Sequence, residues 1–179
     1  MSSQLRESVL NIVTSAVIAS MYFVLVFALA GISFLPFQVR IADMLVMLPS
    51  VVGLPAVYGV TLGCFVANAF APYGANPIDM SLGSLANLLA GYVVYKLAYK
   101  RESYRVLILS SIAASAIITV VVGSYLPVVI GIDASLENVL LIGWVGVLPG
   151  ELVSVVLLGV PVSKVLKRSF KLWRKSPPS

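Results

Sequence analysis

The sequence contains no histidine and only one cysteine, Cys64, among its 179 residues. Without histidine the chain lacks the commonest general base and a ligand of most zinc sites. A single cysteine excludes a disulfide within the chain, and a lone thiol among apolar residues is typically a small core residue. Phosphate-binding glycine loops, nucleophile-elbow motifs and metal-spaced clusters are also missing. We therefore expect no catalytic residue, no metal site, no cofactor bound by this chain and no enzymatic activity.

Charged residues are scarce as well. They make up 11% of the chain, hydrophobic residues make up 60%, and the mean hydropathy is +1.04. A water-soluble core of this length requires far less apolar sequence. The apolar runs are continuous rather than apolar at every second residue, which favours helices over a membrane barrel. The fold class that we predict is an all-α integral membrane protein that crosses the bilayer several times.

The apolar runs divide into six segments. A helix needs about 20 residues to cross the hydrocarbon core. The run over 41–71 is too long for one crossing, and we divide it at Gly53-Leu54-Pro55. The second helix is short for a crossing and needs shielding by its neighbours. The prediction is a single membrane domain over 1–179, a bundle of six transmembrane helices at roughly 9–30, 41–52, 55–71, 78–99, 105–123 and 138–167.

The positive charges indicate an orientation. Lysine and arginine fall mainly at Arg6, over 96–105 and over 164–175. An even number of spans places these three regions on one face, which the positive-inside rule makes cytoplasmic. Both termini are then expected in the cytoplasm. The membrane that we expect the protein to cross is the plasma membrane. Anionic lipid accounts for the basic helix ends, so we expect no nucleic-acid partner.

Three acids lie within or beside apolar runs: Asp43, Asp79 and Glu151. A carboxylate at the centre of a membrane helix costs about 2.5–3.5 kcal/mol on insertion scales, so each needs a partner or a function. Helix directions place Asp43, Asp79 and the amides of Asn68 and Asn87 towards the outer ends of their helices. Glu151 lies roughly three to four turns down the last helix.

Helical spacing groups these residues on faces. One stripe of the fourth helix carries Asp79, Gly83, Asn87 and Gly91. One face of the last helix carries Trp144, Val147, Glu151 and Ser154. A cavity with an aromatic wall, amides and acids is a plausible site for a flat, nitrogen-rich and possibly cationic molecule.

Structural explanations stand beside this hypothesis. Asp79 is well placed to cap its helix. Arg40 and Asp43, three residues apart, can neutralise each other. Asn68 and Asn87 can hydrogen-bond neighbouring helices. Glu151 is the hardest to explain in this way, because no basic residue lies within two turns of it on its own helix.

The first helix carries small residues four positions apart in its cytoplasmic half, Ser15 with Ala19 and Ala16 with Ser20. Such spacing lets another helix approach closely. Packing within the bundle is one interpretation, and docking of a separate protein is the other.

Three segments together resemble a known family: "FQVRIADMLVMLP", "GVTLGCFVANAFAPYG" and "IDMSLGSLANLLAGYVVY". They are similar to the queuosine precursor transporter family, whose members are substrate-binding S components of energy-coupling factor (ECF) transporters. The matching positions are Gln38, Arg40, Asp43, Leu48-Pro49, Gly63-Cys64, Asn68, Pro72-x-Gly74, Asp79, Gly83-Ser84-Leu85-Ala86 and Gly150-Glu151. The chain departs from the family pattern at Asp43, where Glu is usual, and around Ser115, where an Asn is common.

The resemblance implies an S component that captures a deazaguanine at the outer face. It would dock on a transmembrane coupling (T) subunit that is driven by two ATPase subunits, which hydrolyse the ATP. The residues that would bind the substrate are Gln38, Arg40, Asp43, Asn68, Asp79, Asn87, Trp144 and Glu151. The residues that would dock the coupling subunit are Ser15, Ala16, Ala19 and Ser20.

Other functions remain open from the residues. A stand-alone transporter or channel would use the acids to carry protons or cations and would need no ATPase. A membrane enzyme, or an assembly subunit without a ligand, is a further alternative. We see no inverted repeat, which would have favoured the stand-alone transporter.

Overall fold

The computed structural model describes residues 3–35 and 38–175, with side chains placed through residue 170. Within these ranges all regular secondary structure is helical, as predicted. The α-helical elements are α1 (Ser3–Ala28), α2 (Ala30–Ser33), α3 (Pro49–Val52), α4 (Leu54–Ala69), α5 (Ser84–Ala98), α6 (Tyr104–Val129), α7 (Leu136–Asn138), α8 (Val145–Glu151) and α9 (Val160–Lys175). Between them lie a 3₁₀ helix, η1 (Ile41–Met47), and π-helical turns η2 (Asp79–Gly83), η3 (Val139–Trp144) and η4 (Leu152–Gly159).

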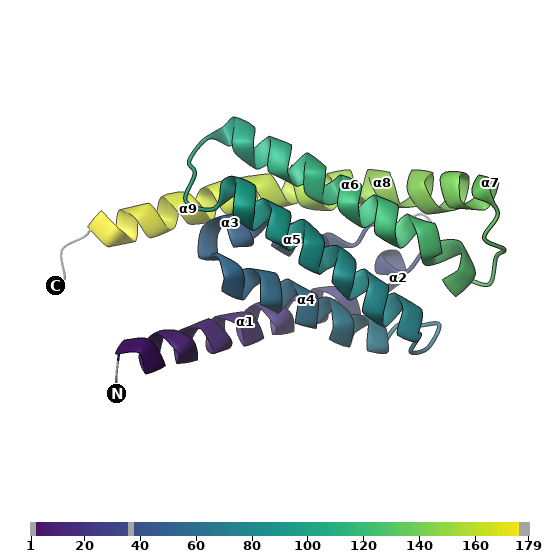
Figure 1. The fold of residues 1–179 in the computed structure, drawn as a ribbon, viewed down its shortest axis with the longest axis horizontal. Coiled ribbons are helices and arrows are strands. Elements are labelled where there is room, and N and C mark those ends of the chain that lie inside the picture. Colours follow the sequence, from purple (N-terminus) through teal and green to yellow (C-terminus); the bar gives the residue numbers. More distant parts are fainter. Residues whose placement is uncertain (1–2, 36–37, 176–179) are drawn as a thin grey trace.

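The elements run back and forth along one long axis (Figure 1). The first turns of α1 and the last turns of α9 lie at the same end of the bundle. In packing order, α1 contacts α4, α4 contacts α5, α5 contacts α6, and α6 contacts η3 and η4. Because η1 contacts both η4 and α1, the helical passes form a closed ring.

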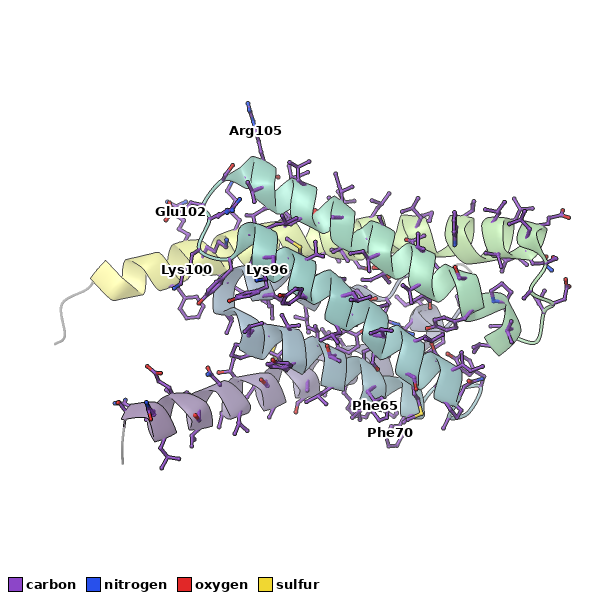
Figure 2. The ribbon with its side chains drawn as sticks, viewed as in Figure 1. Phe65, Phe70, Lys96, Lys100, Glu102 and Arg105 are labelled. Atoms are coloured by element: carbon purple, nitrogen blue, oxygen red, sulfur yellow. The ribbon has the colours of Figure 1, made fainter. Side chains whose placement is uncertain are left out.

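Among the residues that the structure describes, three helical stretches are long and apolar enough to cross a membrane: Ser3–Ala28, Tyr104–Val129 and Leu136–Phe170. Two shorter apolar stretches are Ile41–Val52 and Leu54–Ala69. Large apolar side chains cover the outside, including Phe65 and Phe70, which project away from α4 (Figure 2). The protein is therefore a membrane helical bundle, and six spans with cytoplasmic termini stay a prediction.

The helix limits differ from the sequence expectation at several ends. The first helix ends at Ala28, and α6 continues past Pro127 to Val129. The short second helix is η1, which is 3₁₀, followed by α3. The last pass is one helical stretch interrupted by the π-helical η3 and η4. Wider turns of this kind often occur at functional sites and change which side chains share a face.

The small residues of α1 divide between two faces. Ser15 Oγ donates to the carbonyl of Pro55 over 2.9 Å, and Ala19 packs against Gly63 of α4. A Cβ added at Gly63 would lie 2.6 Å from Cβ of Tyr22 and 2.8 Å from the Ala19 carbonyl oxygen. Ser15 and Ala19 therefore pack within the bundle. Ala16 and Ser20 are exposed on the outer face of α1.

Replacing Gly63 with alanine is expected to destabilise the contact between α1 and α4 by about 1–3 kcal/mol, since the added methyl group meets backbone atoms that cannot move freely. Thermal unfolding of the purified protein in detergent measures the loss. Gly31→Ala is the control, because a Cβ there meets nothing within 4 Å. Equal melting temperatures for the two variants would contradict this account of the packing.

Candidate functional site

Asp43 lies on η1 and is held by two other segments of the chain. Its Oδ1 accepts a hydrogen bond from the Tyr22 hydroxyl of α1 over 2.6 Å and from Asn87 Nδ2 of α5 over 3.3 Å. Asn87 Nδ2 also lies 3.0 Å from the Tyr22 hydroxyl oxygen. All three side chains are at most 2% exposed. The carboxylate therefore sits at the meeting point of three helical passes, with donors that offset part of its desolvation.

Asp79 is held in a similar way by two tyrosines. The Tyr73 hydroxyl donates to Oδ2 over 2.6 Å, and the Tyr125 hydroxyl donates to Oδ1 over 2.7 Å. Burial, followed by the neighbouring Asp79 charge, raises the pKa of Tyr73 above its ordinary value, so this phenol stays protonated as a donor. Asp79 does not cap its helix: the Asn76 side chain accepts from the Ile78 N–H instead.

Arg40 is buried and interacts electrostatically with both aspartates. Its Nη1 is 3.8 Å from Sγ of Cys64, and its Cζ is 5.0 Å from the centre of the Phe34 ring. Within the described ranges Arg40 forms no direct salt bridge with Asp43, so the two opposite charges interact electrostatically without a direct contact. The guanidinium thus has a sulfur and an aromatic face as its near contacts.

Asn68 connects these groups. Its Nδ2 donates to the backbone carbonyl of Asp79 over 2.9 Å and lies 3.7 Å from Sγ of Cys64. The predicted hydrogen bonds of Asn68 and Asn87 to neighbouring elements are therefore present. A Cβ at Gly83 would lie 2.7 Å from Nδ2 of Asn68 and 3.1 Å from the Tyr125 hydroxyl. Only glycine leaves room for this arrangement.

Glu151 completes the cluster from the last helical pass. Its side chain is 2% exposed, and its carboxyl group interacts electrostatically with that of Asp43. Ser115 Oγ of α6 donates to the Glu151 carbonyl over 3.3 Å. Buried Gln38 is a neighbour, because a Cβ at Gly150 would clash with the Gln38 carbonyl.

Three polar atoms of the cluster have no hydrogen-bond partner among the described residues: Arg40 Nε, Asn68 Oδ1 and Glu151 Oε2. Their side chains are between 0 and 6% exposed. A buried polar atom without a partner costs free energy, and native structures usually provide one from the protein, a water or a ligand. One donor and two acceptors therefore remain available inside the cluster. Among the described residues, no group of three His, Cys, Asp or Glu side chains is suited to a metal ion.

The cluster is closed in this structure. Phe34 and Tyr73 pack edge to face with ring centres 5.6 Å apart, and they cover Arg40 and Asp79 respectively. The four hollows that we describe are lined by residues outside this cluster.

The structure thus brings together six of the eight residues predicted to bind substrate: Arg40, Asp43, Asn68, Asp79, Asn87 and Glu151. Gln38 is buried, and its backbone carbonyl lies against Gly150. Trp144 lies apart: it is 37% exposed, its Nε1 is 3.4 Å from Ser124 Oγ, and its ring occupies the space beside Gly123 of α6. It forms no aromatic wall of this cluster.

Sequence reasoning missed the tyrosines Tyr22, Tyr73 and Tyr125. For Tyr22 and Tyr125 a signal existed, because a phenol in an apolar membrane helix needs an acceptor when it is buried. Each such tyrosine predicts a buried polar partner, although the sequence alone does not identify which one.

The profile of the QueT transporter family matches residues 12–168 of the chain. The match includes every residue of the cluster. The searches of curated proteins and of solved structures found no match.

Tyr125→Phe is expected to destabilise the fold by about 1–3 kcal/mol, since the buried Asp79 carboxylate loses one of its two phenol donors. Thermal unfolding in detergent measures the change. Tyr58→Phe is the matched control, because Tyr58 is 54% exposed. If both variants have the melting temperature of the wild type, the Tyr125 hydroxyl does not stabilise the buried Asp79 carboxylate.

Proposed function

The profile match makes this chain a member of the QueT transporter family, a transporter rather than an enzyme, and we propose that it is the substrate-binding S component of an ATP-driven ECF importer. Its substrate would be a queuosine precursor of the deazaguanine class, captured at the outer face of the plasma membrane. The ATP would be hydrolysed by partner subunits.

The observation that carries this proposal is the set of unpartnered polar atoms in a closed cluster, Arg40 Nε, Asn68 Oδ1 and Glu151 Oε2. A deazaguanine presents a ring carbonyl beside N–H groups. The Arg40 donor suits the carbonyl, while Glu151 and Asn68 suit the N–H groups. Charge-assisted hydrogen bonds of this kind are stronger than neutral ones.

Entry of the substrate would begin with separation of the Phe34 and Tyr73 rings. The Tyr73 hydroxyl would leave Asp79, and its place would be taken by water or by a substrate donor. Reclosure of the rings would then shield the substrate from water, which strengthens the hydrogen bonds inside.

The coupling subunit would dock on the outer face of α1. A shallow groove of about 490 Å³ follows Val13, Ala16, Val17, Ser20, Met21 and Val24. Small residues at the centre of the groove permit close approach of another helix. Ser15 and Ala19 pack against α4 and are not available to a partner. Of the four predicted docking residues we therefore retain Ala16 and Ser20.

A stand-alone proton-coupled transporter is the second candidate. The electrostatic interaction between the buried Asp43 and Glu151 carboxyl groups favours it, because acids inside a membrane bundle often belong to proton pathways. Uptake of the substrate by the purified chain alone in liposomes, driven by a pH gradient, would support this candidate. Uptake that requires added coupling and ATPase subunits would support the importer.

Glu151→Gln is expected to weaken binding of a deazaguanine by roughly tenfold to a hundredfold, because a charge-assisted hydrogen bond contributes about 1.5–3 kcal/mol. Calorimetric titration of the detergent-solubilised protein measures the affinity. Glu137→Gln is the control, since Glu137 is exposed on α7 outside the cluster. Unchanged affinity in a folded Glu151→Gln variant would exclude Glu151 from the binding site.

Ala16→Trp is expected to abolish co-purification with the coupling and ATPase subunits while leaving substrate affinity within about twofold, because the indole ring fills the α1 groove far from the cluster. Leu109→Trp is the control, because Leu109 is 64% exposed and the substitution places the same ring on the outer face of α6. Normal assembly of the Ala16→Trp variant would show that docking uses another face.

A further inference from the structure

A second polar feature lies at the end of the bundle where α1 begins and α9 ends, around the loop between α5 and α6 (Figure 2). A hollow of about 430 Å³ separates α3, this loop and α9. Its walls combine apolar and cationic side chains: Val51, Val52, Phe170, Lys100, Arg101 and Lys167. None of these residues belongs to the cluster described above.

Positive charge is concentrated around the hollow. A neighbouring hollow of about 230 Å³ shares Lys167 and Glu102 with it and adds Lys164 and Arg168. Five cations and one carboxylate therefore line the two spaces together. This excess of positive charge attracts an anion, and it is reduced but not cancelled by Glu102.

The loop that carries two of these cations is held in a defined shape. Lys167 Nζ donates to the carbonyls of Ala98 and Arg101 over 2.8 and 2.7 Å, which ties α9 to the end of α5. Lys100 adopts a left-handed backbone conformation with φ of 59°. Lys100 and Arg101 are therefore presented by a fixed loop, which lowers the entropy cost of binding.

An unpartnered donor also borders the hollow. Ser50 lines it, its side chain is 1% exposed, and its Oγ has no hydrogen-bond partner. A hydroxyl in this position needs an acceptor. A phosphate group in the hollow would supply one once the Ser50 side chain turned towards it, and its oxygens would also pair with Arg101 and Lys100.

We propose that this hollow is a binding site for an anionic phospholipid. The phosphodiester group binds Lys100, Arg101 and the Ser50 hydroxyl, and an acyl chain lies along Val51, Val52 and Phe170. A site between helix ends with cations at its rim and apolar walls matches the amphiphilic character of a lipid at the membrane interface. The assignment does not depend on which face of the membrane this end occupies.

Native mass spectrometry and thermal shift in neutral detergent test the site. Wild-type protein is titrated with dioleoylphosphatidylglycerol, with dioleoylphosphatidylcholine and with inorganic phosphate. The expected result is binding of phosphatidylglycerol at least about tenfold tighter than phosphatidylcholine, since each cation near a lipid phosphate strengthens binding severalfold. The double variant Lys100→Gln/Arg101→Gln is expected to lose this preference.

The matched control is the double variant Arg6→Gln/Arg105→Gln, which removes the same total charge. Arg6 is exposed on α1, and Arg105 points away from the bundle (Figure 2). Equal affinity for both lipids would overturn the proposal, as would equal losses in the two double variants, because the effect would then be one of net charge. Stabilisation by inorganic phosphate without lipid binding would assign the site to a free anion instead.

Discussion

Burial of carboxylates in an apolar bundle is the constraint on which the centre of this structure depends. Asp43 and Asp79 are each 2% exposed, and each accepts a short hydrogen bond from at least one tyrosine. Because the donors come from α1, α6 and the loop after α4, satisfying two acids draws distant parts of the chain together. Glu151 differs, since one of its carboxyl oxygens has no partner. The tyrosine donors therefore hydrogen-bond to Asp43 and Asp79, while Glu151 keeps an oxygen that a ligand can contact.

Close helix packing is the means by which these donors reach their acceptors. Gly63 lets Tyr22 approach α4, Gly83 makes room for Asn68 and Tyr125, and Gly150 lets the last pass lie against Gln38. At each of these positions a methyl group would displace an atom of the cluster or of its support. Glycines in this bundle therefore serve the polar network as much as they serve helix packing.

The three surfaces with distinct chemistry lie on different parts of the molecule. The polar cluster is inside the ring of helices, the small-residue groove is on the outer face of α1, and the cationic hollow is at the helix ends around the loop between α5 and α6. Such separation would suit the proposed function, in which the protein holds a solute, docks on a coupling subunit and binds lipid at three different surfaces. A change at one surface can be tested without disturbing the others.

The sequence by itself determined the helical membrane class, because composition and apolar run length depend only on local residue content. It also identified Asp43, Asp79 and Glu151, because a charge in an apolar run is costly wherever the run packs. Family resemblance added Gln38, and the profile match over 12–168 confirmed the family. Helix limits were less predictable, because apolar run length gives no signal for the 3₁₀ turn at η1 or the π-helical turns at η2, η3 and η4.

Only the tertiary structure decided which partner each polar group has. Arg40 and Asp43 are three residues apart, yet Arg40 contacts Cys64 and Phe34 while Asp43 contacts Tyr22. Trp144 shares a predicted face with Glu151 but packs beside Gly123 of α6. Hydrogen bonds and ring contacts act over a few ångströms, so they depend on how distant helices meet, and helix periodicity describes one helix at a time.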